Sequence, residues 1–323
     1  MNIKWILSTS LLLPVLAMAT HATTYTFAPI NYPGANLTIP WGISNNGQIV
    51  GVYEDATGQH GFVDSSGTFT AINFPAAWPI GAIPEGINDN GQIVGYYLAP
   101  IGGNLYEREG FVDSSGTFTS VNIPGSVYTG ALGINDSGQI VGTYSNGSEN
   151  LGFLDSSGTI TTINYLGASG WGTEVFGINA SGQIVGTYSN GSTSLGFVDS
   201  SGTFTTFNVP GASELGGNGT EASAINDSGQ IAGSYYNGST FLGFVDSSGT
   251  FTTINYPGAS ATFVTGIDDT GQVVGFSNFG GAQGPSFVAT PDYSAPTPVP
   301  EPSSIFLIGT ALLGLVAFRS KLL

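Results

Sequence analysis

The decapeptide Gly133-Ile134-Asn135-Asp136-Ser137-Gly138-Gln139-Ile140-Val141-Gly142 recurs with small changes through most of the chain. Its copies are marked by the glutamines Gln48, Gln92, Gln139, Gln183, Gln230 and Gln272. A unit of about 45 residues that recurs in this way indicates a repeat architecture, in which each unit is a supersecondary element that packs on its neighbours.

Each repeat divides into four short apolar segments that turn residues separate. In the third repeat these segments are 131–135, 139–144, 151–155 and 159–165. Short apolar runs bounded by Gly, Asn, Asp and Ser are typical of strands joined by hairpins, in which Gly takes a positive φ. The second and fourth segments carry apolar residues on both parities, so we expect them to be buried on both faces. The glycine inside each second segment, such as Gly142, indicates a close backbone approach.

The number of segments predicts how the array closes. The fourth segment follows a third one only at Phe69, Phe118, Ile160, Phe204 and Phe251. The stretch from Thr24 to Gly34 closely matches the stretch from Thr250 to Gly258, so the missing copy stands at the front. We therefore expect an all-β fold over residues 23–290, a six-bladed β-propeller closed by the N-terminal strand. An open β-solenoid is the alternative, and it would not require a displaced strand.

The charge of the chain narrows the classes of partner. The formal net charge is −17, and the basic residues are Lys4, Arg108, Arg319 and Lys321. Contact with phosphate needs Lys and Arg, so we expect no nucleic-acid partner. The chain contains no Cys, so disulfides are absent.

The two ends read as targeting segments. Residues 1–22 have the basic start, apolar run and small-residue cleavage site of a signal peptide. Residues 291–302 form a Pro-rich linker that ends in Pro300, Glu301 and Pro302. Residues 303–323 are an apolar segment followed by Arg319 and Lys321, which predicts a C-terminal transmembrane helix with a basic cytoplasmic tail.

The order of Pro-Glu-Pro motif, apolar segment and basic tail resembles the PEP-CTERM sorting signal of Gram-negative bacteria. The resemblance implies anchoring in the inner membrane, recognition by the membrane enzyme exosortase, and removal of the tail. It also implies delivery to the cell surface or to the biofilm matrix of a bacterium that makes exopolysaccharide.

The repeats themselves resemble the extracellular repeats of the HAF type. The matching residues run from Gly177 to Gly186 and continue at Gly196-Phe197. The His of that family stands at His60, and most other copies carry Leu at this position. The family has no established activity, so the resemblance implies a location outside the cell and no chemistry.

Aromatic residues in the expected inter-blade loops are the candidates for ligand binding. These residues are Trp41, Trp78, Tyr128 and Trp171. Their rings could stack on sugars, since loops on a rigid scaffold commonly carry function. The alternative is that the rings pack between blades, because aromatic side chains bury a large area.

Catalytic and metal chemistry has weaker support in the sequence. Only His60 remains after removal of a signal peptide, which disfavours a Ser-His-Asp triad and a zinc site. The acidic pairs Glu54-Asp55, Asp268-Asp269 and Glu107/Glu109 are typical of solvated loops. In each Asp-Ser-Ser-Gly turn we expect the Asp side chain to stabilise the turn by bonding to the backbone that follows it. Calcium binding by these aspartates is the alternative. We expect no cofactor.

From these features we expect an exported, non-enzymatic surface protein whose propeller binds polysaccharide or envelope proteins. A glycan-active hydrolase that uses acidic residues and a purely structural matrix component are the alternatives.

Overall fold

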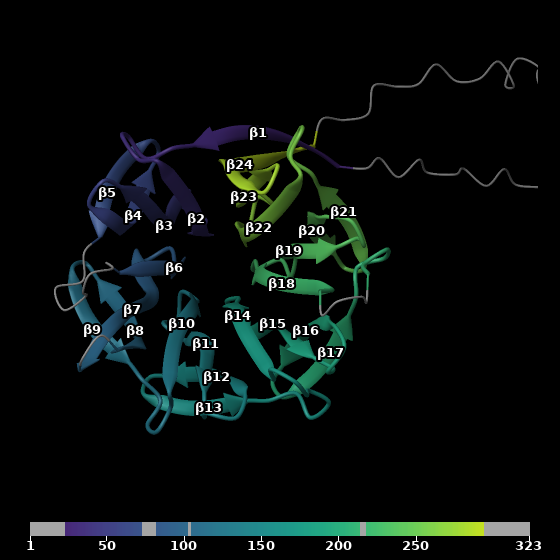
Figure 1. Cartoon of the computed structure of the whole chain (residues 1–323). Coiled ribbons are helices and arrows are strands. Elements are labelled where there is room, and N and C mark those ends of the chain that lie inside the picture. Colours follow the sequence, from purple (N-terminus) through teal and green to yellow (C-terminus); the bar gives the residue numbers. More distant parts are fainter. Residues whose placement is uncertain (1–22, 73–81, 103–104, 214–217, 294–323) are drawn as a thin grey trace, which may run out of the picture. The chain divides into compact units, whose positions relative to one another are not determined.

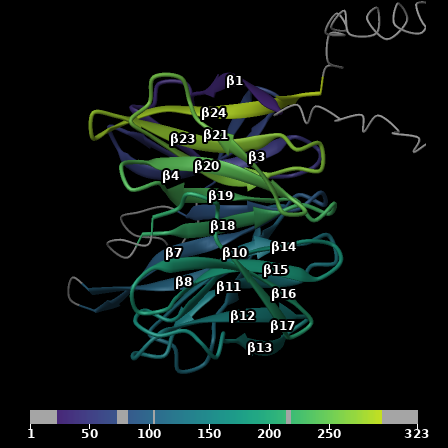
Figure 2. The same cartoon turned by 90° about the vertical axis from the view of Figure 1, so that its right-hand side faces the viewer.

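Six four-stranded antiparallel sheets stand around a central channel, as Figure 1 shows. This computed structural model describes residues 23–72, 82–102, 105–213 and 218–293. The described part of the chain contains strands and turns and no helix, so it has no helix that could cross a membrane. Seen from the side in Figure 2, the turns and loops lie on two opposite faces of the ring. The six-bladed β-propeller expected from the repeats is confirmed, and the open solenoid is wrong.

Each sheet is one blade, and its strands are counted outward from the channel. The innermost strands are β2 (Leu37–Ile43), β6 (Ile83–Ile87), β10 (Tyr128–Ile134), β14 (Thr173–Ile178), β18 (Thr220–Ile225) and β22 (Ala261–Ile267). The second strands are β3 (Gln48–Asp55), β7 (Gln92–Gly102), β11 (Ile140–Ser145), β15 (Gln183–Ser189), β19 (Ile231–Tyr236) and β23 (Val273–Phe279).

The third and fourth strands complete the blades. The third strands are β4 (Gly58–Ser65), β8 (Leu105–Ser114), β12 (Asn150–Ser156), β16 (Ser194–Ser200), β20 (Phe241–Ser247) and β24 (Ala282–Asp292). The fourth strands are β5 (Thr68–Ile72), β9 (Thr117–Val121), β13 (Thr159–Ile163), β17 (Thr203–Phe207), β21 (Thr250–Ile254) and, in the last blade, β1 (Thr24–Ile30). Strand β24 takes in Pro291 and Asp292, which the sequence places in the linker.

The N-terminal strand closes the ring. β1 is the outermost strand of the sheet β1-β24-β23-β22, so the first and last segments of the propeller share one blade. The ring of Phe27 lies 5.2 Å, centroid to centroid, from the rings of both Phe287 and Tyr256. The prediction that the missing fourth strand comes from the front of the chain is therefore confirmed.

The core lies between neighbouring blades. One phenylalanine in each third strand is completely buried, and these residues are Phe62, Phe111, Phe153, Phe197, Phe244 and Phe287. The glycine in each second strand makes room for the innermost strand: a Cβ on Gly142 would lie 2.0 Å from the carbonyl oxygen of Gly130. This contact confirms the close backbone approach that the sequence predicts.

The expected burial holds for the second strands and fails for the fourth. In β11 five consecutive residues are buried, whereas in β13 four of the five residues are exposed. The prediction for the fourth strands was wrong because they form the outer edge of each blade, where only one neighbouring strand and the adjacent blade cover them. The apolar residues of β13 therefore do not indicate burial on two faces.

Candidate functional site

The hairpins that join the third and fourth strands are built by their aspartates. In each one the Asp Oδ1 accepts a hydrogen bond from the backbone N–H of the turn glycine at 2.7 Å, as between Asp155 and Gly158. The serine before that glycine also has a positive φ near 54°, which makes a two-residue turn with two left-handed residues. The carboxylates thus act within their own turns, as the sequence predicts. Among the described residues no group of acidic or histidine side chains is arranged to hold a metal ion.

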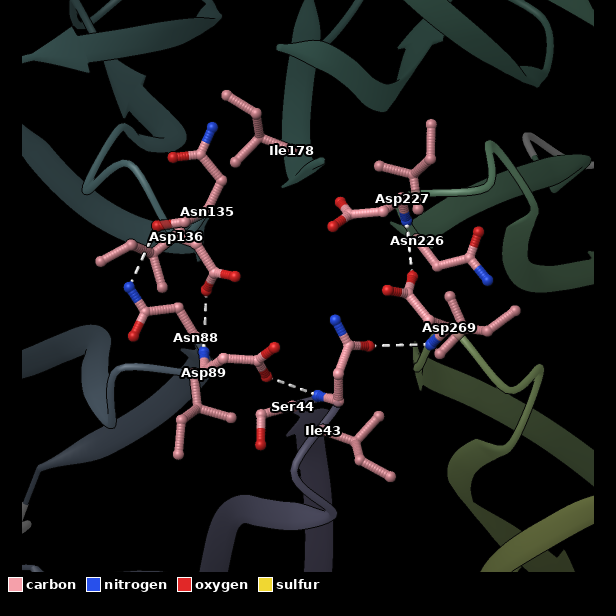
Figure 3. A pocket seen from close by; sticks show the side chains of 15 residues that line it. Ile43, Ser44, Asn88, Asp89, Asn135, Asp136, Ile178, Asn226, Asp227 and Asp269 are labelled. Carbon is pink, nitrogen blue, oxygen red and sulfur yellow. Dashed lines mark hydrogen bonds between the residues drawn. The ribbon is translucent and has the colours of Figure 1, made fainter. Parts of the chain in front are cut away.

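The hairpins between the first and second strands surround one mouth of the channel (Figure 3). In each blade one residue follows the recurring turn Asn or the Ser or Asp that replaces it. We call these six residues the hairpin ring; they are Asn45, Asp89, Asp136, Ala180, Asp227 and Asp269. Five backbone N–H groups donate to the side-chain Oδ1 of the next blade at 2.7–2.9 Å. The series is interrupted where Ala180 offers no acceptor to Asp136.

The turn asparagines add a second set of contacts between blades. Asn135 Oδ1 accepts from the backbone N–H of Gln139, while Asn135 Nδ2 donates to the carbonyl of Asn179 in the next blade at 3.1 Å. Asn88, Asn179 and Asn226 make the equivalent bonds. Both the Oδ1 and the Nδ2 atoms of these side chains are therefore engaged in hydrogen bonds within the protein. At this mouth of the channel the asparagines join neighbouring blades and do not offer free groups to a ligand.

Farther along the channel, each innermost strand carries a β-bulge. The strand pairing skips one residue per blade, for example between Pro40 and Gly42. We call the skipped residues the bulge ring; they are Trp41, Glu85, Leu132, Phe176, Ser223 and Thr265, and all six line the channel. A bulge re-aims a side chain, and here it directs one from each blade to the channel.

The bulge residue differs in every blade. The next two residues are Gly-Ile in five blades and Ala-Ile in one, whereas the residues before the bulge vary, as between Pro40 and Val175. The bulge ring therefore gives the channel a different side chain from each blade.

A cavity of about 290 Å³ opens over this ring. We call it the channel cavity; it is lined by Trp41, Glu85, Tyr96, Arg108, Leu132, Phe176, Glu221, Ser223 and Thr265. It combines aromatic rings, two carboxyl groups, a guanidinium and three hydroxyls. A concave apolar site with a few convergent polar groups is the usual form of a ligand site.

Arg108 is the sole basic residue of the described chain, and it lies on aromatic rings. Its guanidinium carbon is 4.0 Å from the ring centroid of Tyr96 and 5.4 Å from that of Tyr128. Within the described residues no carboxylate oxygen lies within 4.0 Å of it. Stacking on two tyrosines holds the guanidinium in place while leaving its N–H groups without an ion-pair partner.

Three glutamates near the channel have pKa values raised above the ordinary range. Burial raises the pKa of Glu85 to about 8, and the charge of Arg108 partly opposes this effect. Burial also raises the pKa of Glu174, which Asn150 and Arg108 counteract. Desolvation and then the charge of Glu174 raise the pKa of Glu221, although its side chain is exposed at the channel.

The structure brings together only some of the aromatic candidates. Trp41 lies in strand β2 and lines the channel cavity, rather than in an inter-blade loop, because the bulge turns it inward. Tyr128 begins β10, stacks on Arg108, and donates its hydroxyl to Asn150 Oδ1 at 2.7 Å. Trp171 lies in the loop before β14, away from the lining of this cavity. Trp78 lies outside the described residues, as do Pro300, Glu301 and Pro302.

The acidic pairs and His60 make local contacts. Asp55 Oδ1 accepts from Thr57 and lies 3.4 Å from His60 Nε2, all within one hairpin of the first blade. Asp268 and Asp269 bond turn backbones of their own and the neighbouring blade. Glu109 Oε2 accepts from the hydroxyl of Tyr97 at 2.5 Å.

Sequence reasoning missed most of the channel cavity, including Glu85, Leu132, Phe176 and Glu221. A signal was present, because the bulge residue is the variable one immediately before each Gly-Ile or Ala-Ile pair. Without the bulge, however, strand alternation does not show that this position faces the channel.

Comparisons with known proteins agree with the C-terminal signal. Residues 298–321 match the PEP-CTERM protein-sorting motif. No curated protein matches the chain.

Several solved structures are distantly similar. The β-propeller domain of the Trilobed protease from Pyrococcus furiosus is 9% identical with a TM-score of 0.49, over 81% of this chain and 86% of that one. YCF48 bound to D1 peptide is 12% identical with a TM-score of 0.46, over 86% and 98%. Pyrococcus horikoshii acylaminoacyl peptidase is 8% identical with a TM-score of 0.44, and this chain covers 52% of its length and aligns over 78% of its own. Similarity this low transfers no activity.

The sorting motif has a direct consequence for where the protein goes. It implies a protein that is exported, anchored at the membrane through its C-terminus, and then sorted by exosortase.

Proposed function

We propose that the exported propeller is a non-enzymatic binding protein of the cell surface or biofilm matrix, and that it holds extracellular polysaccharide in the channel cavity. The observation that carries this proposal is the bulge ring, where equivalent positions of the six repeats hold six different side chains around one channel. The sorting motif supports an extracellular setting. Removal of residues 1–22, the HAF-type character of the repeats and a stacking role for Trp41 belong to the same proposal.

The cavity offers what a saccharide needs. Trp41 and Phe176 line the cavity with aromatic rings, and Ser223 adds a hydroxyl to the lining. Arg108 offers N–H donors that make no ion pair among the described residues. Tyrosine and tryptophan rings combine an apolar face with a polar edge, which suits ligands of mixed polarity.

The test is retention of the exported protein by polysaccharide from the producing cells, measured by co-sedimentation. Trp41→Ser and Phe176→Ser each put into the ring a residue that the fold already accepts at Ser223, so both variants should fold. We expect each to lower retention about tenfold or more. Trp171→Ala is the control, since this ring is not part of the cavity lining, and it should be retained like the wild type.

Retention that is unchanged in both ring variants would contradict the proposal. If the ring variants instead lose an envelope protein that co-purifies with the wild type while polysaccharide is still held, the channel cavity binds protein and the polysaccharide assignment is wrong. If polysaccharide does not retain the wild-type protein, the proposal is wrong and the purely structural role remains.

One observation favours a second candidate, hydrolysis of a glycan. Glu85, with its pKa raised to about 8, would be protonated at neutral pH and could act as a general acid. Release of reducing sugar by the wild type and its loss in Glu85→Gln would support hydrolysis. We expect no release.

A further inference from the structure

We propose that the ligand of the channel cavity is a cationic saccharide, namely an amino-sugar unit with a free, protonated amine whose ammonium pairs with Glu221. This inference rests on the proposed binding of polysaccharide and specifies the charge that the polysaccharide must carry.

The first step is the charge balance of the cavity. Arg108 acts on Glu85 and on Glu174, so one cation serves two carboxyl groups on its side of the channel. Glu221 belongs to β18. This strand is two blades away from β10, which carries Tyr128, one of the two rings that Arg108 stacks on. In the described chain no cation acts on Glu221, and the charge that does act on it is the like charge of Glu174. A ligand cation would supply the missing partner.

The second step concerns the carboxyl of Glu85. This side chain is partly buried, and within the described residues its oxygens make neither a hydrogen bond nor an ion pair. Burial disfavours the ionised form, and this raises the pKa of the carboxyl. A cationic ligand would favour the ionised form, so binding should release protons.

The third step is the surroundings of these carboxyl groups. Trp41 and Phe176 line the same cavity, and the faces of aromatic rings attract cations. The ring of Tyr96 already carries the guanidinium of Arg108. The indole N–H of Trp41 is buried and has no acceptor among the described residues.

The fourth step separates a sugar from other cations. Ser223 stands two residues from Glu221 on the same strand, so a hydroxyl and a carboxylate lie near each other on the channel side. Neighbouring amine and hydroxyl groups are characteristic of an amino sugar, whereas a lysine side chain brings the amine alone. An anionic sugar is disfavoured, because the chain carries a net charge of −17 and the hairpin ring places carboxylates at the other mouth.

The experiment is calorimetric titration of the exported protein with a glucosamine tetramer and with the same tetramer N-acetylated, at about pH 6, where the amines are protonated. The two ligands differ in the amine charge and its acetyl cap. We expect the free-amine form to bind about tenfold tighter or more, with proton release seen as a dependence of the heat on the buffer.

Matched variants locate the effect. Glu221→Gln keeps the shape of the side chain and removes its charge, and it should abolish the preference for the free amine. Glu54→Gln removes the same charge from an exposed site on β3 outside the cavity, and it should leave the preference as in the wild type.

Each other outcome overturns the inference. Equal binding of the two tetramers, or a preference that survives Glu221→Gln, would show that the charge assignment is wrong while polysaccharide binding stands. A tetralysine peptide that bound as tightly as the amine tetramer would make the cavity a general cation site. If neither tetramer binds, the inference fails, and the retention assay with native polysaccharide separately decides the proposed function.

Discussion

Glu85 links the stability of the propeller to pH. Burial raises its pKa from 4.5 to about 8, so the folded chain holds this proton more tightly than the unfolded chain. The stability that the proton contributes is complete below about pH 4.5 and is lost as the pH rises through about 8. The side chain is only partly buried. We therefore expect a loss on the order of 2 kcal/mol, less than the full pKa shift implies.

Glu85→Gln should flatten this dependence, because the amide has no proton to lose. Urea unfolding at acid and at mildly alkaline pH measures it, and the variant should be the more stable protein above pH 8. Glu54→Gln, at an exposed position of β3, should keep the wild-type slope. A Glu85→Gln variant with the same slope as the wild type would show that Glu85 does not hold its proton.

Ala180 leaves a gap in the hairpin ring that a single substitution can fill. Asn at this position would offer an Oδ1 to the backbone N–H of Asp136, as Asp227 does to Ala180 at 2.7 Å. We expect Ala180→Asn to stabilise the protein by about 0.5–1 kcal/mol, seen as a higher Tm. Ala180→Asp would offer the same acceptor but add a carboxylate to a ring that already holds four, so its gain should be smaller and should grow with salt. No gain from Ala180→Asn would contradict the role assigned to the ring.

At the scale of single elements, the Asp-Ser-Ser-Gly hairpins carry a correctable strain. The second serine of each turn has a left-handed backbone, as at Ser157 with a φ of 54°. Asn tolerates this conformation better than Ser, and Asn-Gly is the preferred sequence of such turns. Ser157→Asn should therefore stabilise the protein by about 0.5 kcal/mol in urea unfolding. Ser156→Asn, outside the left-handed pair, is the control, and an equal effect of both substitutions would contradict this explanation.

The elements also show which features a sequence can reveal. The strands and hairpins could be predicted because turn chemistry is local: Asp155 bonds Gly158 within the same four residues. The bulge could not be predicted in this way, because it arises from the pairing between β2 and β3. It changes the side of the strand on which Trp41 lies from the one that simple alternation predicts. The cavity was missed for the same reason, as Arg108 and Glu221 come from blades that only the closed ring brings around one channel.

At the scale of the whole molecule, the closing strand holds the ring together. Phe27 of β1 packs on Phe287 and Tyr256, while Phe69, its counterpart in β5, packs on Phe62 and Tyr32. Phe27→Ala and Phe69→Ala should each cost about 2 kcal/mol, since both rings are partly buried.

Hydrogen exchange should distinguish these two variants. Phe27→Ala loosens the strand that joins the ends of the propeller, so amides of β24 and β22 should exchange faster. Phe69→Ala weakens a blade whose four strands are continuous in the chain, and β24 should keep its protection. The same exchange pattern in both variants would show that β1 does not hold the two ends of the propeller together.

The channel cavity joins these scales, because its residues come from a bulge in each innermost strand of a ring that β1 closes. A crystal structure of the exported protein with the glucosamine tetramer tests this account most directly. It should show the sugar in the channel cavity, with an ammonium nitrogen within hydrogen-bond distance of the Glu221 carboxylate. A tetramer bound on the outer edge of the blades, with Glu221 facing only water, would contradict it.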